Sequence, residues 1–211
     1  MKMVLGTRRW SSWSMRPWLV ARHAGLDFEE EVVTLRTPET SAALQPYSPG
    51  GQAPVLLDGG LAVWDSLAIC EYLADKHPEK HLWPADLSAR AQGRSACGQM
   101  HSGFQSLRGE CSMDLGAPIQ TLELTQATQA DVRKIVRLWR ELLVRYGGPY
   151  LLGYHWSIAD AFYIPVASRF RTYGVDLSLY GDEDGACAAY VDLCLGNPHF
   201  LEWERLALNE G

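Results

Sequence analysis

The segment 51–73 combines an internal proline, a tight turn and a helix start in a little over twenty residues, and it constrains the fold more than any other stretch. The apolar run 55–57 leads into Asp58-Gly59-Gly60, and a second apolar run, 61–64, follows this turn. Two short apolar runs around such a turn are typical of a β-hairpin. Asp65-Ser66 then indicates a helix start, because the apolar residues after it recur at helical spacing. We therefore predict a hairpin that passes directly into a helix.

Pro54 opens the first strand of that hairpin. A proline is tolerated there only where its missing N–H is not needed, so the backbone beside it is free for another partner. A cis Ala53–Pro54 bond would point the N–H and C=O of Ala53 outward, but only about one X–Pro bond in twenty is cis. The helix start adds unpaired N–H groups and the hydroxyl of Ser66, which suit a carboxylate or a phosphate. We expect two anchoring points for a small anionic peptide close together.

Composition excludes several classes of function. A net charge of -6 gives no electrostatic footprint for nucleic acid or for an anionic membrane. No apolar run approaches the roughly 20 residues that span a bilayer. The five cysteines are scattered without a Cys-x-x-Cys motif, as in reduced thiols of a cytoplasmic protein. The six histidines are equally dispersed, so we expect no metal site.

The order of the patterns predicts two domains. Residues 1–80 read as β-α-β followed by β-β-α, an order that suits an α/β thioredoxin-like domain with a mixed sheet. The strands and helix expected before the hairpin are 3–6, 15–24 and 32–35, with a loop or irregular helix over 36–51. Prolines 78 and 84 mark a linker. Residues 86–211 carry apolar side chains at spacings of three and four and read as an all-α domain.

Two helical stripes and one capping motif stand out in the second half. The first stripe runs from Cys97 to Cys111 and the second from 132 to 146, and we interpret both as core. Ser157 and Asp160 form a capping-box variant before an apolar run, and we assign both a structural role rather than a catalytic one. Pro165 should kink that helix, and Gly196-Asn-Pro198 should break the last helical segment.

Two motifs resemble the cytosolic glutathione transferases. Gln-Ala-Pro-Val-Leu, the Asp-Gly-Gly turn and Asp-Ser-Leu-Ala-Ile-Cys-Glu-Tyr-Leu are similar to the glutathione-binding signature, with Ala53 and Asp65 as mild departures. The N-terminal Ser-Ser-Trp-Ser-Met-Arg resembles the Ser-Ser-Cys-Ser-Trp-Arg of the zeta class. The resemblance extends over nearly the whole chain and implies glutathione as co-substrate. It assigns Gln52 and Ala53 to the cysteinyl and glycyl backbone, Ser66 to the γ-glutamyl carboxylate and Asp65 to its α-amino group, and it places glutathione in the cleft beside Pro54.

The resemblance also implies a serine that activates the glutathione thiol. A free thiol has a pKa near 8.5, and an O–H donated to the sulfur beside a helix N-terminus favours the thiolate. The zeta pattern selects Ser11, whereas counting back from Arg16 as in theta-like proteins selects Ser12, and we favour Ser11. One of these serines is expected anyway as a helix cap. Trp13 replaces the zeta cysteine, which removes the residue for mixed-disulfide chemistry, and Arg16 should pair with a carboxylate of its own domain.

The sequence constrains the identity of the substrate less than any other feature. The resemblance implies a glutathione transferase, and the nearby aromatic side chains favour a small, mainly apolar electrophile. One alternative is a zeta-like maleylacetoacetate isomerase, although Thr172 stands where that pattern has a substrate-binding arginine. A non-catalytic binding or regulatory protein is the other alternative. The expected substrate pocket contains Trp10, Trp13, Arg108 and Arg171, and Arg8 or Arg9 are further candidates for binding carboxylates. The resemblance further implies a homodimer that pairs the first domain of one subunit with the second domain of the other.

Overall fold

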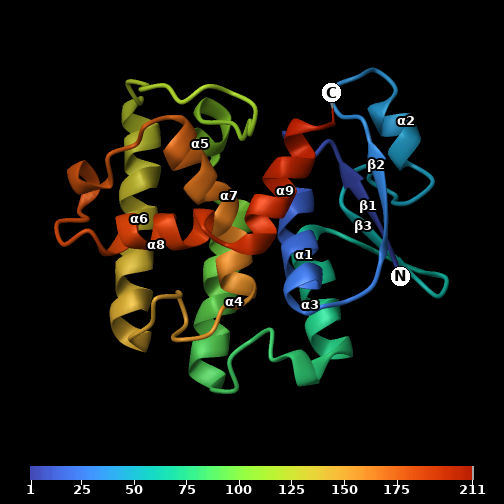
Figure 1. The fold of residues 1–211 in the computed structure, drawn as a ribbon, viewed down its shortest axis with the longest axis horizontal. Helices are drawn as coiled ribbons and strands as arrows, with labels where there is room; N and C mark the ends of the chain where they lie inside the picture. The colour runs from blue at the N-terminus through green and yellow to red at the C-terminus, as the bar shows by residue number, and fades with distance from the viewer. Residues whose placement is uncertain (211) are drawn as a thin grey trace.

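A four-stranded sheet forms in the first third of the chain, whose computed structural model describes residues 1–210 (Figure 1). The strand order is β2-β1-β3-β4, with β1 and β2 parallel and the other neighbours antiparallel. The strands are β1 (Lys2–Gly6), β2 (Glu29–Val33), β3 (Val55–Asp58) and β4 (Leu61–Trp64). The hairpin predicted around Asp58-Gly59-Gly60 is therefore confirmed, and the Ala53–Pro54 peptide bond is cis.

The two faces of the sheet pack against different helices. Because side chains alternate along a strand, Met3 and Leu5 join the main core while Val4 faces the other way. The main core lies on the side of α1 (Ser12–His23) and α3 (Ser66–Lys76). On the opposite face Val4 packs with Leu44 of the short helix α2 (Thr40–Leu44). This β-α-β, β-β-α order confirms the predicted thioredoxin-like half.

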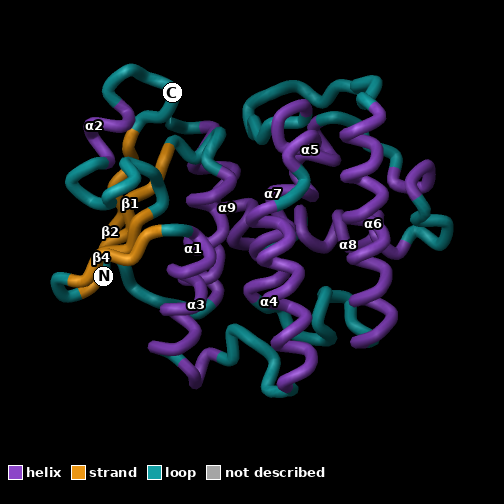
Figure 2. The backbone as a smooth tube through the Cα atoms, turned by 180° about the vertical axis from the view of Figure 1, so that it is seen from behind, coloured by secondary structure: helices purple, strands orange, loops and turns teal. Residues whose placement is uncertain are grey.

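The rest of the chain is helical, and Figure 2 shows α1 and α3 between the sheet and these helices. The helices are α4 (Leu87–Ser102), α5 (Gln105–Glu110), α6 (Gln126–Tyr146), α7 (Ile158–Thr172), α8 (Ala186–Leu195) and α9 (Pro198–Leu208), with 3-10 turns η1 (Pro78–Lys80) and η2 (Leu177–Tyr180). Helix α7 is buried along its whole length except at Arg171, and it packs against α1, α4 and α8. The expected fold class, a thioredoxin-like domain followed by an all-α domain, is confirmed, while the boundary between 80 and 86 stays a prediction.

Asp160 closes the N-terminus of α7. Its carboxylate accepts hydrogen bonds from the N–H groups of Leu151 (3.1 Å) and Ser157 (2.8 Å) and from the hydroxyl of Tyr190 (3.0 Å). Asp160 is fully buried, and this burial raises its pKa. The capping box and these partners confirm the structural role assigned to Ser157 and Asp160.

The element boundaries differ from expectation in a few places. Helix α1 begins at Ser12, three residues early, because Ser11 already caps it by accepting from the N–H of Ser14. Strand β2 covers Glu29–Val33 instead of 32–35, in parallel register with β1. The first helical stripe is interrupted at Phe104, whose φ of 54° starts a new helix. Helix α7 contains Pro165, and the kink expected there stays a prediction. All five cysteines are buried and free, and none of the helices in residues 1–210 is long and apolar enough to cross a membrane.

Candidate functional site

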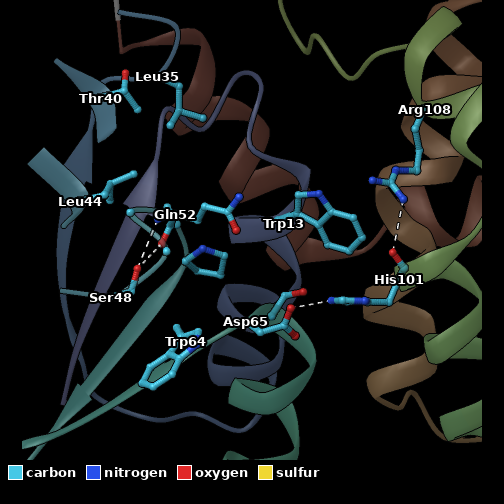
Figure 3. A pocket seen from close by; sticks show the side chains of 15 residues that line it. Trp13, Leu35, Thr40, Leu44, Ser48, Gln52, Trp64, Asp65, His101 and Arg108 are labelled. Carbon is cyan, nitrogen blue, oxygen red and sulfur yellow. Dashed lines mark hydrogen bonds and ion pairs between the residues drawn. The ribbon is translucent and has the colours of Figure 1, made fainter. Parts of the chain in front are cut away.

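The first pocket lies between the sheet half and helix α4 (Figure 3). We call it the Ser66 pocket; its volume is about 520 Å³. It is lined by Trp13, Leu35, Thr40, Leu44, Ser48, Gly50, Gly51, Gln52, Ala53, Pro54, Trp64, Asp65, Ser66, His101 and Arg108. All five residues predicted from the hairpin segment to bind a peptide, Gln52 to Pro54 and Asp65-Ser66, therefore line one cavity.

Ser66 is the first residue of α3 and a buried polar group without a partner. Its side chain is only 2% exposed, and its hydroxyl oxygen has no hydrogen bond within residues 1–210. Buried polar atoms are normally satisfied, so such an orphan indicates a missing partner. Because the start of a helix carries unpaired N–H groups and partial positive charge, the expected partner is an anion.

Asp65 precedes this helix in an unusual backbone conformation, with a φ of 76°. One carboxylate oxygen caps α3 by accepting from the N–H of Leu67 at 2.8 Å. The other lies 2.5 Å from Nε2 of His101, at the end of α4. A non-glycine residue in this region is strained, and such strain is concentrated at binding sites. His101 was not predicted from the sequence, because nothing in the residues around it indicates that this part of α4 meets the start of α3.

The chain before Pro54 leaves main-chain groups open. The hydroxyl of Ser48 donates to the carbonyl of Gln52 (3.2 Å) and accepts from its N–H (3.3 Å), which fixes the loop. The N–H and C=O of Ala53 form no hydrogen bond within residues 1–210. These groups are free to bind an extended peptide as a further strand.

A second pocket of about 450 Å³ lies beside the first. We call it the arginine pocket; its lining is Trp10, Ser12, Trp13, Arg36, Gln105, Arg108, Gly109, Ser112, Met113 and Arg169. It shares Trp13 and Arg108 with the Ser66 pocket, and in Figure 3 the Trp13 ring lies between Gln52 and the Arg108–His101 pair. Its lining contains three arginines and no carboxylate. None of the three forms an ion pair with a carboxylate of residues 1–210.

The serines of the first turn have different surroundings. The hydroxyl of Ser11 donates to Oγ of Ser14 at 2.7 Å, and Oγ of Ser14 in turn accepts from the N–H of Gly6. Ser11 lines neither the Ser66 pocket nor the arginine pocket, whereas Ser12 lines the latter. The role of Ser11 at the thiol stays a prediction. Of the two serines, Ser12 is the one whose side chain lines one of these pockets.

Arg16 differs from expectation. It is completely buried, and its guanidinium has no carboxylate partner in residues 1–210. It donates instead to the carbonyls of Ser12 (2.8 Å) and Phe162 (3.2 Å), and it stacks 4.1 Å from the centre of the Trp13 ring. Burial, with the positive charges of Arg169 and Arg108, lowers the pKa of Arg16 well below its usual value. The expected carboxylate is absent because Arg16 points toward α7 instead of into its own domain.

Three of the four residues expected in the substrate pocket come together, and the fourth does not. Trp10, Trp13 and Arg108 all line the arginine pocket. Arg171 lies away from it and pairs with Glu204 of α9, since it is the only residue of α7 that is not buried. Arg169, two residues earlier, lines the pocket instead.

The two further arginine candidates for carboxylate binding are already paired. Arg8 contacts Glu30 and Glu210, and Arg9 contacts Asp114. Neither arginine lines the Ser66 pocket or the arginine pocket. Of the arginines that line these two pockets, Arg36, Arg108 and Arg169 have no ion pair with a carboxylate of residues 1–210 and can bind an anionic ligand.

The fold and these pockets define a protein in which a thioredoxin-like half and a helical half share the walls of two cavities. Family comparison agrees with this class: residues 10–76 match the N-terminal domain of glutathione S-transferases, and residues 123–205 match the C-terminal domain. The chain therefore belongs to the glutathione S-transferase family.

Individual relatives are distant but cover most of the chain. Glutathione S-transferase 1 of Dianthus caryophyllus is 29% identical over 84% of this chain and 81% of its own length. A probable maleylacetoacetate isomerase of Caenorhabditis elegans is 28% identical over 80% of this chain and 78% of its own. Among solved structures, a bacterial maleyl pyruvate isomerase of the zeta class shares the fold with a TM-score of 0.77 at 22% identity, over the full length of both chains.

Proposed function

We propose that this protein is a glutathione-dependent enzyme that binds glutathione in the Ser66 pocket and attacks a small electrophile with its thiolate. The observation that carries the proposal is the buried hydroxyl of Ser66 at the start of α3, which has no hydrogen-bond partner in the described part of the chain. A carboxylate there receives the hydroxyl and the helix N–H groups together. Membership of the glutathione S-transferase family supports the same ligand.

The lining residues divide the peptide among them. The γ-glutamyl carboxylate binds at Ser66, and its α-amino group faces the carboxylate of Asp65. The open N–H and C=O of Ala53, beside Gln52 and Pro54, bind the cysteinyl and glycyl backbone. This arrangement directs the cysteinyl sulfur toward the start of α1, where a serine hydroxyl and the positive end of the helix stabilise a thiolate.

The chemistry follows from the thiolate. Its sulfur forms a bond to an electrophilic carbon, and either a leaving group departs with the bonding electrons or the neighbouring carbon takes up a proton. Ser12 is the better candidate for the stabilising O–H, because it lines the arginine pocket while Ser11 is engaged with Ser14. The protein supplies no nucleophile of its own in this scheme.

The arginine pocket is the expected site of the electrophile, and its charge changes the expected substrate. The aromatic side chains near the expected pocket favoured a mainly apolar electrophile, and Trp10 and Trp13 do supply apolar surface. However, Arg36, Arg108 and Arg169 form no ion pair with a carboxylate of residues 1–210, so an electrophile that carries a carboxylate gains charge-assisted hydrogen bonds there. This observation favours an anionic electrophile. It also supports a second candidate function, that of a zeta-like isomerase that adds glutathione to a cis double bond and releases it after rotation about the bond.

Paired activity assays test the function. Conjugation of glutathione to a halonitrobenzene and isomerisation of maleylacetone are measured on the same preparation. Turnover in either assay supports the enzyme, and efficient isomerisation with negligible conjugation would select the second candidate. Binding of glutathione with no turnover of either substrate would favour the non-catalytic alternative.

We also propose two features of the whole molecule. The chain divides into a glutathione-binding domain, residues 1–80, and a helical domain, residues 86–211, and two copies pair the first domain of one with the second domain of the other. Light scattering should give twice the 23.5 kDa of one chain. A stable single-chain mass at micromolar concentration would argue against the dimer.

A further inference from the structure

Two buried guanidinium groups hold Ser12. Arg16, one turn later in α1, donates to its carbonyl oxygen at 2.8 Å. Arg169, from α7 in the helical half, approaches its hydroxyl oxygen with Nη2 at 3.4 Å. The contact between Arg169 and Ser12 could not be predicted from the sequence, because the two residues lie 157 positions apart in the chain.

The direction of this hydrogen bond decides what the hydroxyl of Ser12 can do. A guanidinium has only donors, so the oxygen of Ser12 accepts and its proton points elsewhere. That proton has no acceptor within residues 1–210, and Ser12 lines the arginine pocket. Ser11 is the opposite case, since its proton is given to Oγ of Ser14. Of the two serines, only Ser12 has a proton available for a bound thiolate.

The charge of Arg169 adds to this orientation. Its side chain is 5% exposed, and its other nitrogens donate to the carbonyls of Cys111 (2.9 Å) and Pro165 (3.3 Å). Burial, with repulsion from Arg108, lowers the pKa of Arg169 to about 10, so it remains a cation at neutral pH. Arg169 has no carboxylate partner among the described residues, and a buried cation of this kind strengthens the adjoining hydroxyl as a donor and favours an anion beyond it.

We infer that Arg169 is a positioning residue for thiol activation. It fixes the oxygen of Ser12 so that the hydroxyl proton is directed to the glutathione sulfur, and its charge stabilises the thiolate through that hydroxyl. The inference rests on the proposed function, in which glutathione binds in the neighbouring pocket. Arg169 acts from the helical domain, so the activating group is completed only when the two halves of the chain pack together.

The test is to measure the pKa of the bound thiol. The ultraviolet absorbance of the thiolate is titrated against pH in the full-length protein with saturating glutathione. We expect Arg169→Met to raise this pKa by about one unit, which is a tenfold loss of thiolate below the pKa. The rate at pH 6.5 should fall by a similar factor and recover as the pH rises. Arg169→Lys should restore part of the shift, and exposed Arg133→Met on α6 is the matched control that should change nothing.

A double variant separates a positioning role from a structural one. If Arg169 acts through Ser12, then Arg169→Met in a Ser12→Ala background should change the thiol pKa little further. An unchanged thiol pKa in folded Arg169→Met, with a lowered pKa in the parent protein, would overturn the inference and leave the proposed function standing. An ordinary thiol pKa in the parent would instead overturn thiol activation itself. If the methionine variant does not fold, Arg169→Lys and Arg169→Gln decide, and equal thiol pKa values in these two would also overturn the inference.

Discussion

Asp65, at the start of α3, and His101, at the end of α4, join the two halves of the protein at a distance of 2.5 Å. Asp65 thereby has one oxygen on the cap of α3 and the other in the Ser66 pocket, where the α-amino group of glutathione is expected. The ring centre of His101 also lies 5.3 Å from the ring centre of Trp13. Both halves of the chain therefore build the expected γ-glutamyl site.

The first prediction concerns the charge of Asp65. Asp65→Asn keeps an N-cap and tolerates the positive φ, but it removes the charge opposite the α-ammonium. Because the side chain is partly exposed, we expect glutathione binding to weaken by about 0.5–1 kcal/mol in calorimetry. The matched ligand is glutaryl-cysteinyl-glycine, which lacks the amino group and should bind the parent and the variant equally. Equal losses for both ligands would show that Asp65 does not contact the amino group.

The second prediction concerns Ser66. Ser66→Ala removes the buried hydroxyl and should weaken glutathione binding by roughly 1.5–3 kcal/mol, the range for a hydrogen bond to a charged group. Ser95→Ala, at an exposed position of α4, is the matched control and should leave the affinity unchanged. Calorimetry on the three proteins measures the difference. An unchanged affinity in Ser66→Ala would remove this residue from the site.

The side of the Ser66 pocket formed by Gln52 to Pro54 and Asp65-Ser66 was predictable from the sequence, because these residues belong to one contiguous segment. The proline, the turn and the helix start all fall between Gln52 and Ser66, and their backbone preferences are local. The buried capping box of Asp160 was predictable for the same reason. Register was less predictable: β2 begins at Glu29 because pairing with β1 overrides the weaker local preference of its glutamates.

The rest of the site depends on contacts between distant segments. Arg169 and Arg171 have the same local sequence signal, and only the packing of α7 decides that the first faces Ser12 while the second pairs with Glu204. Arg16 was expected to find a carboxylate, yet its partners are main-chain carbonyls, which carry no signal in a sequence. His101 was missed because the side chain it contacts belongs to the other half of the chain.

The third prediction separates the two serines of the first turn. Ser12→Ala should lower kcat about tenfold or more while changing glutathione affinity little, because its hydrogen bond matters most to the thiolate. Ser11→Ala should cost about 1 kcal/mol of folding stability through loss of the α1 cap, with a smaller effect on turnover. Kinetics and chemical denaturation of both variants distinguish these roles. The reverse pattern, with Ser11→Ala the catalytically damaging change, would restore the zeta alignment.

The fourth prediction concerns the charge of the electrophile. We compare 4-chloro-3-nitrobenzoate with its neutral amide, so that the two substrates differ mainly in the carboxylate. Arg108→Gln should lower kcat/KM for the benzoate about fivefold to tenfold, and should change the value for the amide little. The ratio of the two substrates cancels their different intrinsic reactivities. A variant that loses equally on both would indicate that Arg108 supports the pocket without binding the carboxylate.

The most direct test of the whole account is the pKa of the glutathione thiol when it is bound to the unmodified protein. A spectroscopic titration of the complex follows the thiolate absorbance from pH 5 to pH 10. An unperturbed thiol titrates at about 8.5, and the helix N-terminus, the hydroxyl of Ser12 and the buried guanidinium of Arg169 all favour the thiolate. We predict a bound-thiol pKa at least one unit below that of free glutathione under the same conditions. A complex whose thiol titrates like free glutathione would contradict the account.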